Sequence, residues 1–152
     1  MSIFDELESL YSDIDNRYAA EQFAALSAGD KQREAEAWYN RQLNDQAYFL
    51  FMFTRLEDRI RALSKSVILK NQQSLPDWKS KSAWDVLMSQ KKYLTLLDTV
   101  SLLTPKGHAD YRLIQEYKLL RDKIAHGDMP PLPAIVPTVV NDMKRLHHVL
   151  SL

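Results

Sequence analysis

At 152 residues, with 45% apolar and 26% charged residues, the chain has the composition of one globular domain that spans residues 1–152. It has no cysteine, which excludes disulfides and thiolate metal sites. Twenty basic residues balance twenty acidic ones, so bulk charge cannot drive binding to nucleic acid, and any such activity requires a local basic cleft.

The N-terminal sequence Met-Ser-Ile-Phe-Asp-Glu is acidic and lacks the basic region and the apolar run of a secretory signal. No apolar stretch in the chain approaches membrane-spanning length. We therefore expect a cytoplasmic protein that does not engage a membrane.

Apolar residues of the first 26 positions recur every three or four residues, which is the period of an amphipathic helix. Gly29 is suited to end this helix, and Asp30 to cap the next one. The following residues, 31–70, contain neither glycine nor proline. They predict one long second helix, either continuous or broken near Asn44-Asp45. Its first half is polar and its second half apolar, so we expect the second half to be the core element.

Residues 71–81 lack a clear pattern and predict an irregular stretch that turns at Leu75-Pro76-Asp77, with Trp78 as a packing anchor. Ser82, with Asp85 three residues on, indicates the start of a helix whose apolar stripe continues to Leu103. A further helix over 108–125, a proline-rich break at 129–133 and a terminal helix over 135–150 follow. The sequence thus predicts an all-α, up-and-down bundle of about five helices, one of them long.

Three residues able to carry chemistry gather at residues 121–127 (Arg-Asp-Lys-Ile-Ala-His-Gly), where a helical pattern ends. Asp122 and His126 are four apart, so the carboxylate can accept from one imidazole nitrogen and fix which nitrogen faces outward. Arg121 and His126 are five apart and point about 140° away from each other on a regular helix. They converge on one ligand only if the helix unwinds at His126 or if a second copy faces the first.

A histidine that moves protons beside a guanidinium that holds phosphate oxygens suits phosphodiester chemistry. The alternative is an ordinary helix end, where cationic side chains are favourable because the helix dipole is negative there. Spacing alone does not decide between the two.

The 121–127 segment resembles the signature of the HEPN family: an arginine, a polar residue, three variable residues and a histidine. In that family the motif lies near the C-terminal end of the third core helix of a four- or five-helix bundle, and one more helix follows. A second resemblance is Phe53-Thr54-Arg55-Leu56-Glu57, which looks like the aromatic-Arg-apolar-Glu segment on an earlier helix of several HEPN subfamilies. Glu57 borders the apolar stripe, so it either faces a cleft or pairs with Arg61, four residues on.

The resemblance implies a metal-independent endoribonuclease that needs no cofactor and acts as a homodimer, with two motifs meeting across the two-fold axis. His126 would act as general acid or base, Arg121 would stabilise the phosphorane, and Asp122 would orient either His126 or the arginine. The implied substrate is RNA rather than DNA, and the implied product is a 2′,3′-cyclic phosphate. We add Lys123, Arg55 and Glu57 as expected substrate-binding residues.

Many members of the family are toxins or phage-defence nucleases, often beside a nucleotidyltransferase antitoxin, so such a partner is expected here. In one toxin branch the antitoxin modifies a tyrosine two residues after the histidine, a position held here by Asp128. Regulation by that route is therefore not expected. The alternative function is a non-catalytic helical interaction module, namely an adaptor, an antitoxin-like partner or an inactive HEPN domain. The neutral net charge and the polar start of the second helix favour it.

Overall fold

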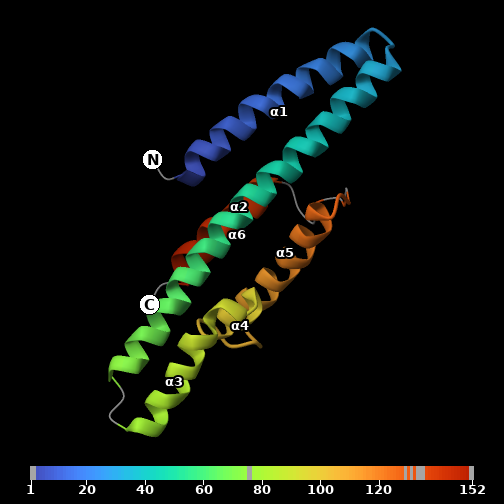
Figure 1. Ribbon diagram of the computed structural model, residues 1–152. Helices are drawn as coiled ribbons and strands as arrows, with labels where there is room; N and C mark the ends of the chain where they lie inside the picture. Colours follow the sequence, from blue (N-terminus) through green and yellow to red (C-terminus); the bar gives the residue numbers. More distant parts are fainter. Residues whose placement is uncertain (1–2, 75–76, 129, 131, 133–135, 151–152) are drawn as a thin grey trace. The chain divides into compact units, whose positions relative to one another are not determined.

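The computed structural model describes residues 3–74, 77–128, 130, 132 and 136–150, and within these residues every regular element is helical (Figure 1). The all-α prediction and the long second helix are confirmed. Six α-helices and one 3₁₀ turn are present in the described ranges: α1 (Ile3–Ser27), α2 (Lys31–Ser74), α3 (Trp78–Gln90), η1 (Lys91–Tyr93), α4 (Leu96–Ser101), α5 (Ala109–Ala125) and α6 (Val136–Val149).

The junction between α1 and α2 forms as the sequence predicts. Gly29 has a φ of 69°, a conformation that glycine adopts without steric cost, and it ends α1. Asp30 then caps α2, because its carboxylate accepts a hydrogen bond of 3.1 Å from the Arg33 amide. The helix α2 continues through Asn44-Asp45 to Ser74, so the predicted alternative of a break there is wrong.

The second half of α2 supplies most of its buried residues, as predicted. Before Tyr48, α2 buries only Ala37 among its apolar side chains. From Tyr48 onward the helix buries a regular series, Tyr48, Phe49, Met52, Phe53, Leu56, Ile60, Leu63 and Ile68. Each of these side chains removes apolar area from water, and this stripe is the main stabilising surface of the helix.

The prediction of an irregular stretch over residues 71–81 is largely wrong. The helix α2 runs on to Ser74, and α3 begins at Trp78 rather than at Ser82. Asp77 is the cap, since its carboxylate accepts from the Ser80 amide at 2.9 Å. The predicted turn residues Leu75 and Pro76 lie outside the described residues. Trp78 is 73% exposed, because it occupies the first position of a helix that buries none of its residues, so its prediction as a packing anchor is also wrong.

The predicted continuous helix from Ser82 to Leu103 is wrong as well. Thr95 has an extended backbone (φ −67°, ψ 165°) and starts α4 with a capping box, in which the Thr95 and Asp98 side chains each accept from the other's backbone amide. The apolar spacing continues across this break, with Leu96 and Val100 buried, so periodicity alone did not reveal it. This break adds one helix to the five that the sequence predicts.

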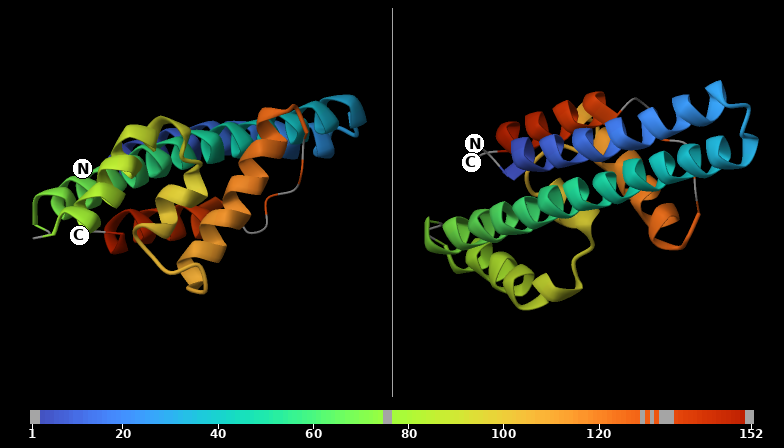
Figure 2. Two further views of the ribbon diagram at one scale, coloured as in Figure 1. Left: turned by 60° about the horizontal axis from the view of Figure 1, so that its bottom comes forward. Right: turned by 90° about the horizontal axis from the view of Figure 1, so that it is seen from above.

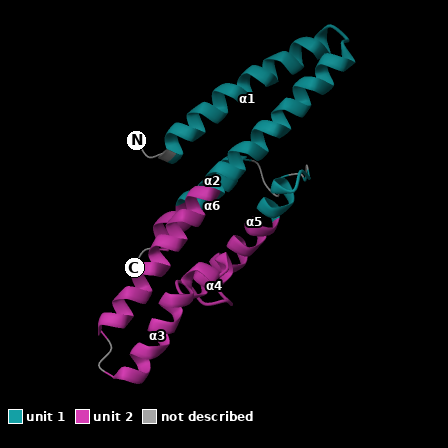
Figure 3. Ribbon diagram, in the orientation of Figure 1, with its two compact units in different colours: residues 1–53, 120–144 teal, residues 54–119, 145–152 magenta. Residues whose placement is uncertain are grey.

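The chain forms two compact units, each assembled from segments that are distant in the sequence (Figure 3). Unit 1 comprises residues 1–53 and 120–144, and unit 2 comprises residues 54–119 and 145–152. In unit 1, α1 lies beside the first half of α2 in all views (Figures 1 and 2). In unit 2, the buried Asp110 carboxylate accepts from Arg145 at 2.6 Å and so joins α5 to the end of α6. The expectation of one domain over residues 1–152 stays a prediction.

Candidate active site at the end of α5

The Arg121 guanidinium is held between a buried ring and a carboxylate in unit 1. Its central carbon lies 5.7 Å from the centroid of the Phe53 ring, which is within the range of a cation–π contact. Its Nη1 atom lies 2.9 Å from Oδ1 of Asp122. The side chains of Arg121 and Asp122 are each about one-third exposed, at 31% and 32%. The arginine is therefore supported from two sides and still reaches solvent.

Phe53 is itself fixed, because it is fully buried in α2 and stacks on Phe49 with ring centroids 6.1 Å apart. The residue belongs to the 53–57 segment that was singled out from the sequence for its arginine and glutamate. The contact with Arg121 joins positions 68 residues apart, counted as 121 minus 53, so no local pattern could indicate it. Phe53 is thus a supporting residue of the candidate site that sequence reasoning missed.

The last turn of α5 closes in a Schellman motif around Gly127, which has a φ of 91°. The Asp128 amide donates to the Lys123 carbonyl at 3.1 Å, and the Gly127 amide donates to the Ile124 carbonyl at 3.0 Å. These two bonds satisfy carbonyl groups that would otherwise lack partners at the helix end. His126 is the C-cap residue of this motif, and its side chain is exposed.

The backbone at His126 keeps the helical register. Its amide donates to the Asp122 carbonyl at 3.0 Å and also approaches the Lys123 carbonyl at 3.1 Å. The helix thus ends at Ala125, and the His126 amide still holds the helical hydrogen bond. In this register Arg121 and His126 remain about 140° apart around the helix axis, so one copy of the segment does not aim both side chains at one point.

Asp122 forms an ion pair with Arg121, and its expected role, orientation of either His126 or the arginine, stays a prediction. A carboxylate bound to a guanidinium restricts its rotation, and a guanidinium that is oriented in this way matches the geometry of phosphate oxygens. Lys123 lies next to this pair and is exposed, which adds a second cation at the same helix end.

The other two expected substrate-binding residues belong to unit 2. Arg55 is exposed, and Glu57 accepts from Arg61 at 2.7 Å. The pairing of Glu57 with Arg61, one of the two alternatives predicted for this glutamate, is therefore the observed one. The expected site residues are thus divided, with Arg121, Asp122, Lys123 and His126 in unit 1.

The two adjacent histidines of α6 lie near its C-terminal end. His147 and His148 lie edge to face with ring centroids 5.9 Å apart, and burial, followed by the charges of Arg59 and His148, lowers the pKa of His147. Among all residues that the structure describes, no three histidine, aspartate or glutamate side chains are grouped so that they could hold a metal ion.

No family model, no curated protein and no solved structure matches this chain. Within the described residues, no helix is long and apolar enough to cross a membrane. The fold and the candidate site together define an all-α protein that carries an arginine, a carboxylate and an exposed histidine at the C-terminal end of one helix.

Proposed function

We propose that this chain is a metal-independent endoribonuclease of the HEPN type, in which a second copy of the chain completes the active site. The observation that carries the proposal is the hydrogen bond from the His126 amide to the Asp122 carbonyl, which keeps the backbone in helical register up to His126. Because Arg121 and His126 then point to different sides of α5, a phosphate that contacts both types of side chain lies between two copies.

The chemistry assigned to this site needs one proton carrier and one fixed positive charge. His126 of one copy removes the proton from an RNA 2′-hydroxyl, and the 2′ oxygen attacks the neighbouring phosphorus atom. The bond from phosphorus to the 5′ oxygen breaks, and that oxygen takes up a proton. The products are a 2′,3′-cyclic phosphate and a 5′-hydroxyl end.

Arg121 of the other copy binds the non-bridging oxygens, whose negative charge grows in the phosphorane. Its contacts with Phe53 and Asp122 support this role, since a guanidinium that is already oriented loses less entropy when it binds a phosphate. The exposed Lys123 adds local positive charge, which a chain with no net charge requires for binding RNA.

The test compares RNA cleavage in the presence of EDTA by the wild type, Arg121→Ala and His126→Ala, with the ends of the products identified. We expect both variants to lose at least about a hundredfold in rate, the usual contribution of a proton carrier or of an oxyanion donor. His148→Ala is the matched control, because it removes another exposed histidine. No cleavage of any RNA by the wild type, or full activity in both variants, contradicts the proposal.

Mixing the two inactive variants tests the contribution of the second copy. A dimer of Arg121→Ala with His126→Ala retains one intact pair, formed by the arginine of one copy and the histidine of the other. Random association makes half of the dimers mixed, so recovery to about one quarter of the wild-type rate is expected for a two-fold symmetric site. If the arginine and the histidine of a single copy act together, mixing restores nothing.

A toxin or phage-defence role, with an antitoxin or nucleotidyltransferase partner, belongs to the same proposal. A ribonuclease of this kind would require a neutralising partner during growth. Co-expression with the product of the neighbouring gene tests this: rescue of growth inhibition in cells that express the wild type supports the role, and growth without inhibition contradicts it.

A second candidate function, the non-catalytic interaction module, is favoured by one observation. Large apolar side chains are exposed on the last two turns of α1 and on the early turns of α2, namely Phe23, Leu26, Trp38, Tyr39 and Leu43, each between 42% and 71% exposed. Such residues are enriched at protein interfaces. An inactive wild type that binds a protein partner equally well after Arg121→Ala and His126→Ala favours this candidate over the ribonuclease.

A further inference from the structure

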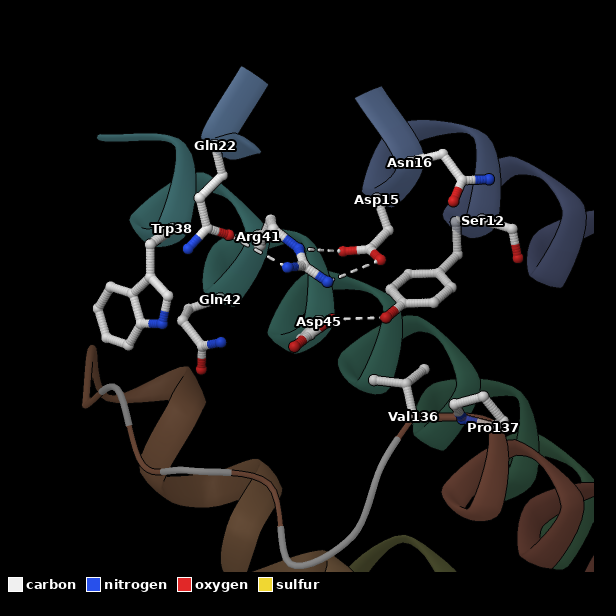
Figure 4. A pocket seen from close by; sticks show the side chains of 11 residues that line it. Ser12, Asp15, Asn16, Gln22, Trp38, Arg41, Gln42, Asp45, Val136 and Pro137 are labelled. Carbon is white, nitrogen blue, oxygen red and sulfur yellow. Dashed lines mark hydrogen bonds and ion pairs between the residues drawn. The ribbon is translucent and has the colours of Figure 1, made fainter. Parts of the chain in front are cut away.

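Unit 1 contains a pocket of about 460 Å³ that is separate in its residues from the 121–127 segment (Figure 4). The side chains that line it come from α1, from the first half of α2 and from the start of α6. Its volume lies in the range that holds a small organic ligand. The charged groups in its wall decide what kind of ligand it suits.

The one guanidinium in the wall is already neutralised. Arg41 donates from Nε to Oδ1 of Asp15 at 2.8 Å and from Nη2 to Oδ2 of Asp15 at 3.1 Å. Its Nη1 atom donates to Gln22 at 3.2 Å. Figure 4 shows Asp15 and Arg41 pointing toward each other from α1 and α2. A bidentate pair of this kind is strong and directional, so Arg41 is not available to bind an anion.

Asp45 contributes the remaining charge of the pocket. Its Oδ1 atom accepts a hydrogen bond of 2.7 Å from the Tyr11 hydroxyl, and its side chain is half-buried. Burial raises the pKa of this carboxyl, the Tyr11 hydrogen bond lowers it, and the charges of Asp15 and Arg41 act in opposite directions. With two carboxylates and one guanidinium, the described wall carries one net negative charge.

An indole ring lines the pocket two helical turns before this carboxylate, on the same face of α2. Trp38, Gln42 and Asp45 are four and three residues apart on α2, and Figure 4 shows all three facing the pocket. The Trp38 side chain is 53% exposed. In this wall the exposed indole offers an alkyl stem a flat apolar surface, and the half-buried carboxylate offers a cation a counter-charge.

We infer that this pocket binds an organic cation, a guanidinium or primary ammonium group on an alkyl stem, with the charged group at Asp45 and the stem against Trp38. Such a ligand supplies the positive charge that compensates the half-buried carboxylate, and the neutral Asp15–Arg41 pair leaves no competing anion site. The cation is either a free small molecule or an arginine or lysine side chain of another protein. This binding is independent of the ribonuclease chemistry assigned to α5.

The test is isothermal titration calorimetry of the full chain with two probes. Agmatine represents a free cation, and the blocked tripeptide acetyl-Gly-Arg-Gly-amide represents a protein side chain. Acetyl-Gly-Leu-Gly-amide is the uncharged control. Binding of agmatine alone identifies a free small cation as the ligand class, binding of the arginine peptide alone identifies a side chain, and binding of both identifies the shared group. Binding of neither overturns the inference.

Matched variants locate the binding. Asp45→Asn retains an oxygen that accepts from Tyr11 but removes the charge, and we expect it to weaken binding at least about tenfold. Asp13→Asn makes the same change at an exposed position of α1 outside the pocket and leaves binding unchanged. Equal affinities of these two variants overturn the inference.

A second variant keeps the test valid if Asp45→Asn does not fold. Trp38→Ala changes an exposed side chain, so folding is retained, and we expect it to weaken binding about threefold through loss of the ring. Wild-type affinity in Trp38→Ala contradicts the placement of the ligand stem. RNA cleavage by each variant, measured in parallel, distinguishes this site from the one on α5, because neither substitution touches the 121–127 segment.

Discussion

The guanidinium carbon of Arg121 lies 5.7 Å from the centroid of the Phe53 ring, although 68 residues separate them (121 minus 53). Phe53 is fully buried and stacked on Phe49, so this ring is a fixed platform. Asp122 holds the same guanidinium through an ion pair of 2.9 Å. The arginine is therefore oriented by one long-range contact and by one contact with its neighbour in the chain. Its geometry depends on the core as much as on the helix end.

Phe53→Leu tests this dependence. Loss of the ring removes the cation–π contact, and we expect RNA cleavage to slow about threefold. The substitution also lowers the free energy of unfolding by about 1 kcal/mol, because the core is less well filled. Met52→Leu introduces the same side chain at the neighbouring buried position and controls for altered packing. Identical cleavage rates of the two variants, measured well below their unfolding temperatures, would falsify the role of the ring.

Gly127→Ala tests the helix end that carries His126. The φ of 91° at this position is unfavourable for alanine, while no atom stands within 4 Å of the place that an alanine β-carbon would occupy, so the cost is confined to the backbone. We expect a loss of about 1 kcal/mol in unfolding free energy together with reduced cleavage, because the Schellman motif that places His126 is disturbed. Gly107→Ala, also in open space but without a positive φ, is the control and changes neither quantity. Full activity of Gly127→Ala speaks against the motif as a positioning element.

Thr95→Ala tests the break that separates α3 from α4. The capping box is lost, and the urea midpoint at pH 7 falls by an amount equivalent to about 1 kcal/mol. The Thr95 hydroxyl and amide also lower the pKa of Asp98 below its ordinary 3.8. Because the pKa of Asp98 is lower in the folded state than in the unfolded state, its ionised carboxylate increases the free energy of unfolding above pH 3.8. This contribution is lost as the pH falls through the folded-state pKa. The difference between wild type and variant therefore shrinks as the solution is acidified through that pKa, and a difference independent of pH contradicts this account.

Asp45→Asn tests how much the pocket carboxylate lowers the free energy of unfolding when no ligand is bound. Because burial raises the pKa of Asp45, the folded state binds a proton more readily than the unfolded state. The free energy of unfolding therefore falls as the pH rises from below 3.8, the ordinary pKa of an aspartate, through the raised pKa of Asp45. The variant lacks this loss, so we expect its thermal midpoint at pH 7 to exceed that of the wild type, with the two converging at low pH. A variant that is less stable at pH 7 shows that the carboxylate is stabilising.

The sequence was sufficient for features that arise within a few residues or from one helix period. The apolar stripes predict α1, α5 and α6, and the absence of glycine and proline predicts the length of α2. The junction at Gly29-Asp30 follows from backbone sterics and from a side chain that caps the next helix. The prediction failed where two local signals gave different results. The apolar spacing continues past Thr95 and predicts one helix, whereas the capping box of Thr95 starts a new helix, α4.

Only the tertiary structure decided what surrounds the functional candidates. The spacing of Asp122 and His126 is visible in the sequence, but the ion pair of Asp122 with Arg121 depends on a side-chain rotamer that spacing does not fix. The platform provided by Phe53 and the pocket formed by Asp15, Trp38, Arg41 and Asp45 join positions on different helices. The sequence of the 121–127 segment therefore determines which chemical groups lie at this helix end, because they belong to one short stretch of the chain. Their support comes from long-range packing, which a helix period does not encode.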